Sequence, residues 1–474
     1  MLSDPGGVRE ITARWAIAGE LLLESAAHLG AGRGDSVDMS LLRDPLTGGP
    51  VLTGASLAGA LRSYLADVLG GYRSNEDARV AQLFGVARGD DVGEQSPLIV
   101  FDSIGHFPAA SSVEIRDGLQ IDAPRGTAAP HKKFDVEVLP AGTLFAVRFD
   151  LLISDVDQED DLLNLLVTAL NGLSNGDISL GARRSRGLGA IRAGRWQARR
   201  YDLTTAEGWL EWVSSDWEMP LSAERGTSDE VREACMRAHR GVTLTSFDDR
   251  RRRIRITANI SPVNGVLVRS APAAADAPDT AHIKSDGRSV LPGTALAGAI
   301  RNHAGRIARV AGEGHADSDR WVERMFGPRS ERVSGTPPPR LYASRVRIQE
   351  SFLDDGARMR PSRVRIDRFT QGIVPGALFD EEPEFGGRAR VLLELREPEP
   401  GELGLLLLLV RDLLDGDLAV GGASSVGRGR FTGRGTLTLE DGRSVDLDPR
   451  APADPTVTEA IEELWASPVI DCHP

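Results

Sequence analysis

Apolar and polar positions alternate in a way that predicts two similar sets of elements along the chain. Residues 11–23 have the apolar character of a buried strand. Residues 252–260 show the pattern more cleanly, because isoleucine and alanine there alternate with arginine, threonine and asparagine. A period of two buries one face of a strand and leaves the other face polar. Each strand is followed by a loop with carboxylates and by a helical apolar pattern after Gly54 or Gly293, so we predict two copies of one unit.

The later elements follow the same order in both copies. A landmark, Leu83-Phe84-Gly85 or Met325-Phe326-Gly327, comes first, and its phenylalanine is expected to fill the core. The remaining segments are a strand at 98–101 or 340–343, a long polar excursion, a strand at 144–153 or 389–395, a helix at 160–173 or 402–414, and a Gly-rich stretch at 181–194 or 421–435. This order is that of a β-α-β-β-α-β ferredoxin-like unit, the unit that also serves as the RNA-recognition motif, so we predict an α+β fold.

The repeat also sets the expected domains. We predict a first domain over residues 1–195 and a second over 250–445, followed by a tail over 446–474. Residues 196–249 contain four tryptophans, at 196, 209, 212 and 217, and a charged helical segment near 228–239. This stretch is expected to be an ordered linker that packs on the first domain.

Composition places the chain among soluble globular proteins. Hydrophobic residues make up 41% of the 474 positions and charged residues 26%. The two cysteines, Cys235 and Cys472, cannot alone build a disulfide framework or a zinc site, and their scarcity suits a reducing cytoplasm. The longest apolar run, Leu405–Val410, is too short to span a bilayer, and the N-terminus lacks the features of a signal peptide. We therefore expect a cytoplasmic protein without a membrane segment.

A net charge of −13 excludes a uniformly basic nucleic-acid binder, so any phosphate must meet local clusters of positive charge. Such clusters occur in the first Gly-rich stretch, at 250–255, and in the second polar excursion, which is expected to form a two-stranded hairpin. The helix starts at Gly54 and Gly293 could bind phosphate through unpaired backbone N–H groups. The alternatives are an ordinary amphipathic helix with a tight entry turn, a solvated hairpin and a flexible glycine turn.

The stretch HLGAGRGDSVDMSLLRDPLTGGPVLTGASLAGALRS at 28–63, the Leu83-Phe84-Gly85 landmark and the loop GARRSRGLGAI together carry a resemblance to a known family. The chain resembles a tandem protein of the RAMP superfamily, the repeat-associated proteins of CRISPR effector complexes, and most of all the backbone subunit of type III complexes. The resemblance covers both halves and is weaker in the second. Residues 196–249 and the tail lie outside it.

The resemblance implies two RAMP domains with thumb hairpins and Gly-rich loops, which bind guide RNA along a palm and cleave target RNA with a loop aspartate. The family pattern D-x-P-[VI]-[IVL]-[KR]-D matches Asp38 in DMSLLRD, with Ser40 in place of proline. In the second copy the same register falls on Asp279 in DTAHIKS, where Ser285 replaces the second acid. Both aspartates are therefore expected catalytic and metal-binding residues, with the second loop the more altered one.

A carboxylate fits this chemistry because RNA carries its own nucleophile, the 2′-hydroxyl. An aspartate can accept a proton or bind Mg²⁺ or another divalent cation, and one carboxylate makes a full metal site only once RNA phosphates join it. The alternative for Asp38 is a turn residue that accepts hydrogen bonds from nearby backbone N–H groups. His28 is expected to be structural, and none of the eight histidines has metal-ligand spacing.

The expected partners are a guide CRISPR RNA, a single-stranded target RNA and other subunits of the effector complex. Two alternatives are a non-catalytic guide-binding scaffold of the same kind of complex and a stand-alone guide-processing RAMP nuclease. The residues predicted to contact RNA are Gly54, Ser56, Arg62, Lys132, Lys133, Arg183, Arg184, Arg186, Arg253, Gly293, Arg301, Arg363, Arg365 and Arg428.

Overall fold

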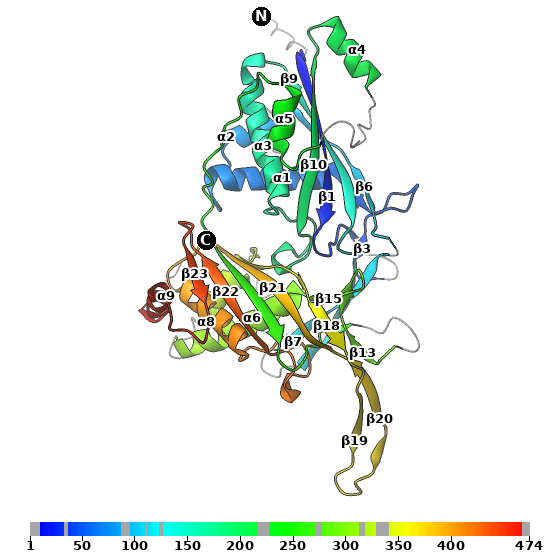
Figure 1. Ribbon diagram of the computed structural model, residues 1–474, viewed down its shortest axis with the longest axis vertical. Helices are drawn as coiled ribbons and strands as arrows, with labels where there is room; N and C mark the ends of the chain where they lie inside the picture. Colours follow the sequence, from blue (N-terminus) through cyan, green and yellow to red (C-terminus); the bar gives the residue numbers. More distant parts are fainter. Residues whose placement is uncertain are drawn as a thin grey trace, which may run out of the picture.

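The computed structural model describes residues 10–32, 37–86, 95–109, 111–122, 127–215, 227–270, 277–311, 318–328 and 341–466. Two halves lie end to end along the long axis, the first half above the second in Figure 1. Each half has an antiparallel sheet with helices packed against one face. No helix in these ranges is long and apolar enough to cross a bilayer.

The first half is built on a sheet in which the repeat strands have the order β10-β1-β9-β5, all antiparallel. Its elements are β1 (Ala13–Leu23), β2 (Gly30–Gly32), β3 (Ser40–Leu41), β4 (Val51–Leu52), α1 (Gly54–Gly70), α2 (Ala78–Phe84), β5 (Leu98–Val100), β6 (Ser103–His106), β7 (Glu114–Asp122), β8 (Thr127–Val138), β9 (Leu144–Ile153), α3 (Glu159–Ser174), β10 (Ile191–Asp202), α4 (Ala206–Ser214) and α5 (Val231–Ala238).

The second half repeats this topology, with the order β22-β11-β21-β16. Its elements are β11 (Arg253–Pro262), β12 (Arg269–Ser270), β13 (Thr280–His282), β14 (Lys284–Ser285), β15 (Arg288–Leu291), α6 (Gly293–Ala311), α7 (Ser318–Phe326), β16 (Val346–Ile348), β17 (Ser351–Phe352), β18 (Asp354–Arg358), β19 (Ser362–Ile366), β20 (Ile373–Glu382), β21 (Glu384–Arg396), α8 (Glu402–Asp415), β22 (Phe431–Thr438), β23 (Ser444–Leu447) and α9 (Pro455–Ala466). In chain order this is the strand arrangement 4-1-3-2 of a ferredoxin-like unit, as in the first half.

Each half has its own apolar core between sheet and helices. Trp15, Ile17 and Leu21 of β1 face α1 and α3, and Leu61 and Leu65 of α1 are fully buried against them. A fully buried leucine contributes about 1.5–3 kcal/mol. The alternation in β11 buries Ile254, Ile256 and Ile260 in the same way, so the predicted strand faces are confirmed.

Some predicted elements differ from the observed ones. The strand expected at 340–343 lies instead at Val346–Ile348, and residues 341–343 have no regular structure. In the first landmark Leu83 fills the core while Phe84 is only half-buried, whereas Met325 and Phe326 are both buried in the second. The boundary expected at 195 falls inside β10, where Trp196 is fully buried in the first core. Trp217 lies outside the described residues.

The two polar excursions both form hairpins, but they end in different surroundings. The β7–β8 hairpin of the first half reaches the second half, where Arg116 forms a buried ion pair with Glu350 through Nη2 and Oε1 at 3.1 Å. The β19–β20 hairpin projects away from the body at the far end of the molecule (Figure 1). The excursions are therefore ordered strands, and one of them joins the halves.

Candidate RNA-binding cleft and the two loop aspartates

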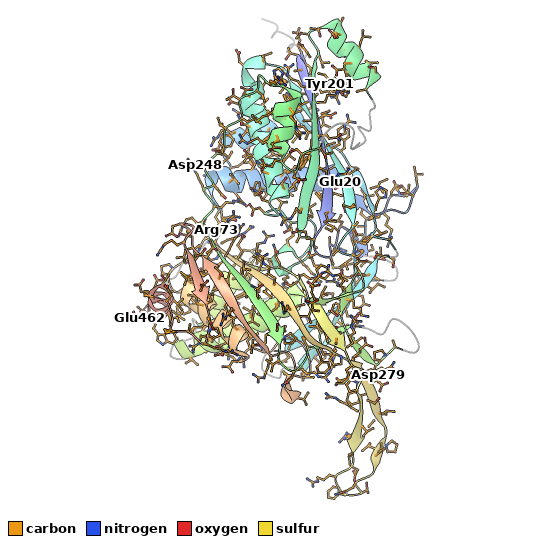
Figure 2. All side chains as sticks on the ribbon, viewed as in Figure 1. Glu20, Arg73, Tyr201, Asp248, Asp279 and Glu462 are labelled. Atoms are coloured by element: carbon orange, nitrogen blue, oxygen red, sulfur yellow. The ribbon has the colours of Figure 1, made fainter. Side chains whose placement is uncertain are left out.

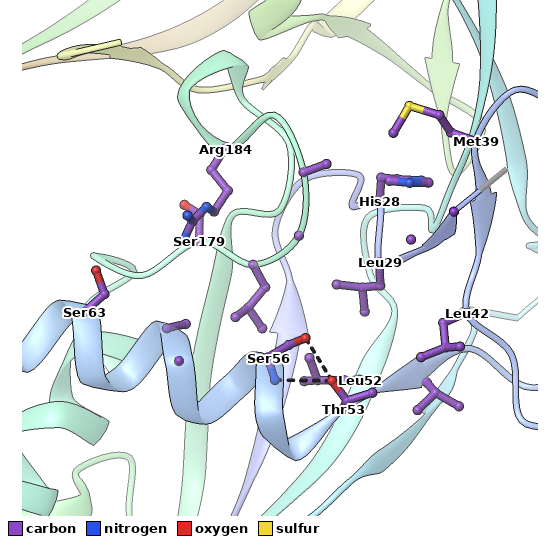
Figure 3. A pocket seen from close by; sticks show the side chains of 18 of the residues that line it. His28, Leu29, Met39, Leu42, Leu52, Thr53, Ser56, Ser63, Ser179 and Arg184 are labelled. Atoms are coloured by element: carbon purple, nitrogen blue, oxygen red, sulfur yellow. Dashed lines mark hydrogen bonds between the residues drawn. The ribbon is translucent and has the colours of Figure 1, made fainter. Parts of the chain in front are cut away.

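A cleft of about 830 Å³ opens in the first half. Figure 3 shows the first turn of α1 with Thr53 and Ser56 on one side, Arg184 on the Gly-rich loop above it, and His28 and Met39 on the opposite wall. Asp38 also lines the cleft. Three of the segments that the sequence singled out therefore meet at one place.

Asp38 is exposed, and its position is fixed by the hairpin strand beside it. Its Oδ2 accepts a hydrogen bond of 3.1 Å from the backbone N–H of Asp135 in β8. Met39 pairs with Val136 as a parallel bridge, with further backbone bonds to Asp135 and Glu137. The carboxylate is thus held in place through Oδ2 by the neighbouring hairpin strand.

Asp279 occupies the equivalent position in the second half. Its Oδ2 accepts a hydrogen bond of 2.8 Å from the backbone N–H of Asp380 in β20, and Thr280 pairs in parallel with Glu381. Figure 2 shows Asp279 at the base of the projecting hairpin. The alignment of the two repeats that matched Asp279 with Asp38 therefore agrees with the structure, in which the two residues are equivalent.

The Gly-rich loops have the same backbone in both halves, but the glycines serve a different purpose from the one expected. Gly181 and Gly421 have φ of 81° and 91°, and Gly189 and Gly429 have φ of 74° and 72°. A Cβ at Gly181 would collide with the carbonyl of His28, and one at Gly189 with that of Leu180. These glycines let the loop pack on the protein's own backbone, so the close approach is to protein and not to phosphate.

The helix starts are also filled by protein groups. The backbone N–H of Gly54 donates to Asp102 Oδ1 at 2.7 Å, and a Cβ there would collide with the carbonyl of Val100. At the start of α6, a Cβ on Gly293 would lie 2.5 Å from the carbonyl oxygen of Arg186. The expectation that Gly54 and Gly293 bind phosphate does not fit these contacts, whereas Ser56 is exposed and lines the cleft.

Arg62 and Arg301 have the same structural task in the two halves. Arg62 donates to the carbonyl of Gly85 at 3.1 Å and pairs with Glu76, while Arg301 donates to the carbonyl of Gly327 at 2.7 Å. Each arginine thereby ties the long helix to the glycine of its landmark. These contacts explain the two residues without RNA.

The other predicted basic residues fall into three groups. Arg253, Arg363 and Arg428 form internal ion pairs, and the Arg428 side chain is only 6% exposed, so its predicted contact with phosphate does not fit. Arg183 is half-buried over the Phe134 ring at 4.3 Å, and this burial lowers the pKa of its guanidinium. The exposed members are Lys132, Lys133, Arg184, Arg186 and Arg365, with Lys133 also 3.3 Å from Asp117.

The loops around the two aspartates differ in charge. Arg183, Arg184 and Arg186 correspond, through the aligned glycines, to Ala423, Ser424 and Val426. Conversely, Leu188 and Val136 pack together in the first half, and their counterparts Arg428 and Glu381 form a buried ion pair of 2.7 Å in the second. The basic loop beside Asp38 is therefore absent beside Asp279.

The structure explains His28, which was expected to be structural, and two acidic residues that the sequence did not single out, Asp102 and Glu137. His28 is buried and its Nδ1 lies 2.7 Å from the carbonyl of Glu137, which agrees with a structural role. Asp102 caps α1, and Glu137 accepts from the Leu41 N–H at 2.9 Å to hold the aspartate loop. Within the described ranges, no group of three or more His, Cys, Asp or Glu side chains could hold a metal ion.

Comparison with known proteins gives two results. A family model described as the RAMP superfamily matches residues 20–192 and 277–432, one segment in each half. The chain is also 27% identical over 211 residues to the CRISPR system Cms endoribonuclease Csm3 of Methanothermobacter thermautotrophicus. That match covers 37% of this chain and 82% of the relative.

Proposed function

Because this chain belongs to the RAMP superfamily, we propose that it is a backbone subunit of a type III CRISPR effector complex. It binds guide RNA and, together with other subunits, cleaves complementary target RNA beside Asp38. The cleft carries this proposal, since it brings an exposed carboxylate, the first turn of α1 and the exposed Arg184 of the Gly-rich loop to one place. The name of the relative, an endoribonuclease, favours the same activity.

The residues present can perform the cleavage by positioning and proton transfer. Arg184 and Arg186 bind phosphates of the RNA backbone by charge, and Ser56 adds a hydroxyl at the edge of the cleft. The β8 strand holds Asp38 through the Asp135 N–H, and the carboxylate accepts the proton of a 2′-hydroxyl aligned for in-line attack. As the 2′-oxygen bonds to phosphorus, the bond from phosphorus to the 5′-oxygen breaks, which leaves a 2′,3′-cyclic phosphate and a 5′-hydroxyl that takes its proton from water. Alternatively, the Asp38 carboxylate together with RNA phosphates would hold a divalent cation such as Mg²⁺, which would supply charge stabilisation at the scissile phosphate.

We extend the proposal to Asp279 as a second cleavage residue, because its carboxylate is held by the Asp380 N–H in the same way. Two equivalent aspartates in one chain would give two cuts at a fixed separation along the target. The second loop lacks the three arginines of the first, so phosphate there must be held by other groups, and Arg365 of the adjacent hairpin is exposed.

A non-catalytic guide-binding scaffold is the second candidate. One observation favours it: both aspartates already accept backbone hydrogen bonds and thereby join their loops to the hairpins. In a scaffold they would be structural residues only. Replacing Asp38 with asparagine separates the two functions, because the amide oxygen still accepts the hydrogen bond while the charge is lost.

The decisive experiment uses the complex purified with its guide RNA and a labelled complementary target. Under the proposal, Asp38→Asn loses one cut while guide and target binding persist. The control Asp157→Asn changes an exposed aspartate that does not line the cleft, and it cuts normally. Unchanged cleavage by both Asp38→Asn and Asp279→Asn would leave the scaffold as the function. Sequencing of RNA that copurifies with the chain tests guide binding independently of cleavage.

A further inference from the structure

The two halves are joined through the outer face of the second sheet, the face turned away from its helices. Asp177, which follows α3 in the first half, lies between three arginines of the second half. Arg251 Nη2 is 2.9 Å from its Oδ2, Arg253 Nη1 is 3.0 Å from its Oδ1, and Arg255 also pairs with it. Glu394 of β21 completes this cluster, at 3.2 Å from Arg255. The first half thus contacts the second half at the start of β11, and we call this part of the sheet surface the receiving face.

The register of the strands shows which residues of the first sheet are equivalent to the arginines at the start of β11. Ser96 and Ser344 make matching hydrogen bonds, each to the carbonyl of its landmark helix and to the carbonyl two residues on. From there Leu98 pairs with Leu151 and Leu151 with Trp15. In the second half Val346 pairs with Leu395 and Leu395 with Ile254.

This register places Arg14 at the position of Arg253 and Ala16 at that of Arg255. The acid is retained as well, because Asp150 takes the place of Glu394. Arg14 forms an ion pair with Asp150, as Arg253 does with Glu394 at 3.8 Å. In the same register Thr12 stands at the position of Arg251. The first half therefore keeps one arginine and the acid of the receiving face, and it lacks the other two arginines.

In the first half this face is covered by α4. The Arg14 guanidinium lies 3.8 Å from the centre of the Trp212 ring, and Trp212 packs edge-on against Tyr201 at 5.1 Å. Ala16 and Ala18, which point away from the main core, are 1% and 4% exposed beneath this cluster. Figure 1 shows α4 at the end of the molecule opposite the β19–β20 hairpin, and Figure 2 places Tyr201 there.

Several contacts hold α4 in this position. Thr205 caps its first turn, Trp209 Nε1 donates to the carbonyl of Leu203 at 2.7 Å, and Glu211 lies 3.3 Å from Arg199 of β10. Gly208 sits so close to the carbonyl of Asp202 that a Cβ would collide with it. The helix is packed on the sheet, and Trp212 stands where Asp177 stands in the second half.

We propose that α4 is a cap that closes the first half to a second copy of this chain. Terminal repeats of stacked proteins commonly differ from internal ones in this way, because an uncovered stacking face would continue the array. At the other end, the turn after α8 repeats that after α3, since Asp417 and Leu418 donate to the carbonyl of Asp412 as Asp177 and Ile178 donate to that of Gly172. Asp417 is exposed among the described residues. The tandem therefore does not extend head to tail through its own copies. This inference rests on the repeat geometry and does not depend on RNA cleavage.

The test replaces residues 205–215, which contain α4, with a Gly/Ser sequence of the same length and adds Ala16→Arg to supply the arginine that the second half has. Mass is measured by light scattering over a wide range of concentrations, after ribonuclease treatment so that RNA cannot bridge copies. Circular dichroism and cooperative thermal unfolding establish that the variant is folded. The matched control adds Asp417→Arg to the uncapped variant.

The intact chain is expected to remain a single copy, and the uncapped Ala16→Arg chain to self-associate at least about tenfold more tightly, with Asp417→Arg abolishing the gain. The proposal is overturned if the uncapped chain still associates when Asp417→Arg is added. It is also overturned if the uncapped chain is folded and stays a single copy. So does an intact chain that self-associates and is dissociated by Asp417→Arg, an outcome that can be observed even if the uncapped variant does not fold.

Discussion

Asp38 accepts a hydrogen bond from the backbone N–H of Asp135 at 3.1 Å, which attaches the loop at the cleft to the β7–β8 hairpin. The same bond between Asp279 and Asp380 shows that it belongs to the repeat. A residue with a structural bond and an exposed carboxylate combines two roles, and substitutions have to separate them.

The first prediction concerns Asp38. Asp38→Asn keeps the acceptor for the Asp135 N–H and removes the negative charge, so target cleavage should fall about 100-fold or more while the melting temperature stays unchanged. Asp38→Ala should lose the same cleavage and also about 1 kcal/mol of stability, because a backbone donor loses its partner. Cleavage of labelled target RNA and thermal unfolding measure the two effects. An Asp38→Asn chain that cuts normally contradicts a catalytic role.

Local patterns in the sequence predicted the repeat, the topology and several element bounds closely. β9 is Leu144–Ile153 as expected, and α1 begins at Gly54, because apolar periodicity and bounding glycines are encoded within each segment. The strand at Val346–Ile348 was predicted several residues too early, because a three-residue strand is too short for the alternation of apolar and polar residues to fix its position.

The site was predicted less completely, because partners come from distant segments. The sequence around Gly54 does not predict that Asp102 accepts a hydrogen bond from its backbone N–H. Likewise, the sequence around Arg428 does not predict its ion pair with Glu381. A basic residue in a suggestive loop can therefore be a phosphate contact or half of an internal ion pair. The matched positions of Arg62 and Arg301 before the two landmarks were a usable signal for a structural role, since both serve the same glycine carbonyl.

The second prediction concerns the basic loop beside Asp38. Replacing Arg184 and Arg186 with alanine should weaken RNA binding for all sequences alike, because both side chains are exposed and charge acts on the backbone. The slope of log K against log salt should become shallower by about 0.7 for each lost phosphate contact. Arg443→Ala, an exposed arginine paired with Asp441 in the second half, is the control and should leave the slope unchanged. Equal slopes for all the chains would contradict the assignment.

The third prediction concerns the ion pair that replaces Leu188 and Val136 in the second half. Glu381→Val leaves the buried Arg428 without its carboxylate and should cost on the order of 3 kcal/mol in the free energy of unfolding. Adding Arg428→Leu should recover most of this loss, because the pair then matches the apolar contact of the first half. Arg363→Ala, which removes the more exposed partner of Glu381, should cost less than about 1 kcal/mol. Urea unfolding of the three variants measures these differences, and a double variant that is no more stable than Glu381→Val would contradict the coupling.

The fourth prediction concerns the projecting hairpin. Residues 365–377 can be replaced by Asn-Gly, which suits a two-residue turn between Val364 and Leu378, a cross-strand pair. Phe369 is 81% exposed, so the shortened chain should unfold at the same temperature as the full chain. If the hairpin contacts RNA, target cleavage should fall while guide binding remains. Arg358 must be kept, because it pairs with Glu384 at 2.9 Å and donates to Ser289 inside the second half.

The last prediction concerns the junction between the halves and its response to acid. Burial alone raises the pKa of Asp177, but Arg251, Arg253 and Arg255 outweigh it and hold the pKa well below its ordinary range. A carboxyl group whose pKa is depressed in the folded state stabilises that state at neutral pH, and the stabilisation is lost as pH falls below about 4 towards the folded pKa.

Asp177→Asn should therefore destabilise the chain at pH 7 by on the order of 3 kcal/mol, because three arginines then face one another with only Asp249 and Glu394 between them. The difference between variant and native chain should shrink as pH falls below about 4, since protonation removes the same charge from the native chain. Unfolding by urea at a series of pH values measures this. Asp417→Asn is the control, since this exposed aspartate occupies the equivalent turn of the second half and should change little at any pH. A difference that stays constant as pH falls would show that the contribution of Asp177 is not electrostatic, and the ion cluster would then not be what holds the two halves in register.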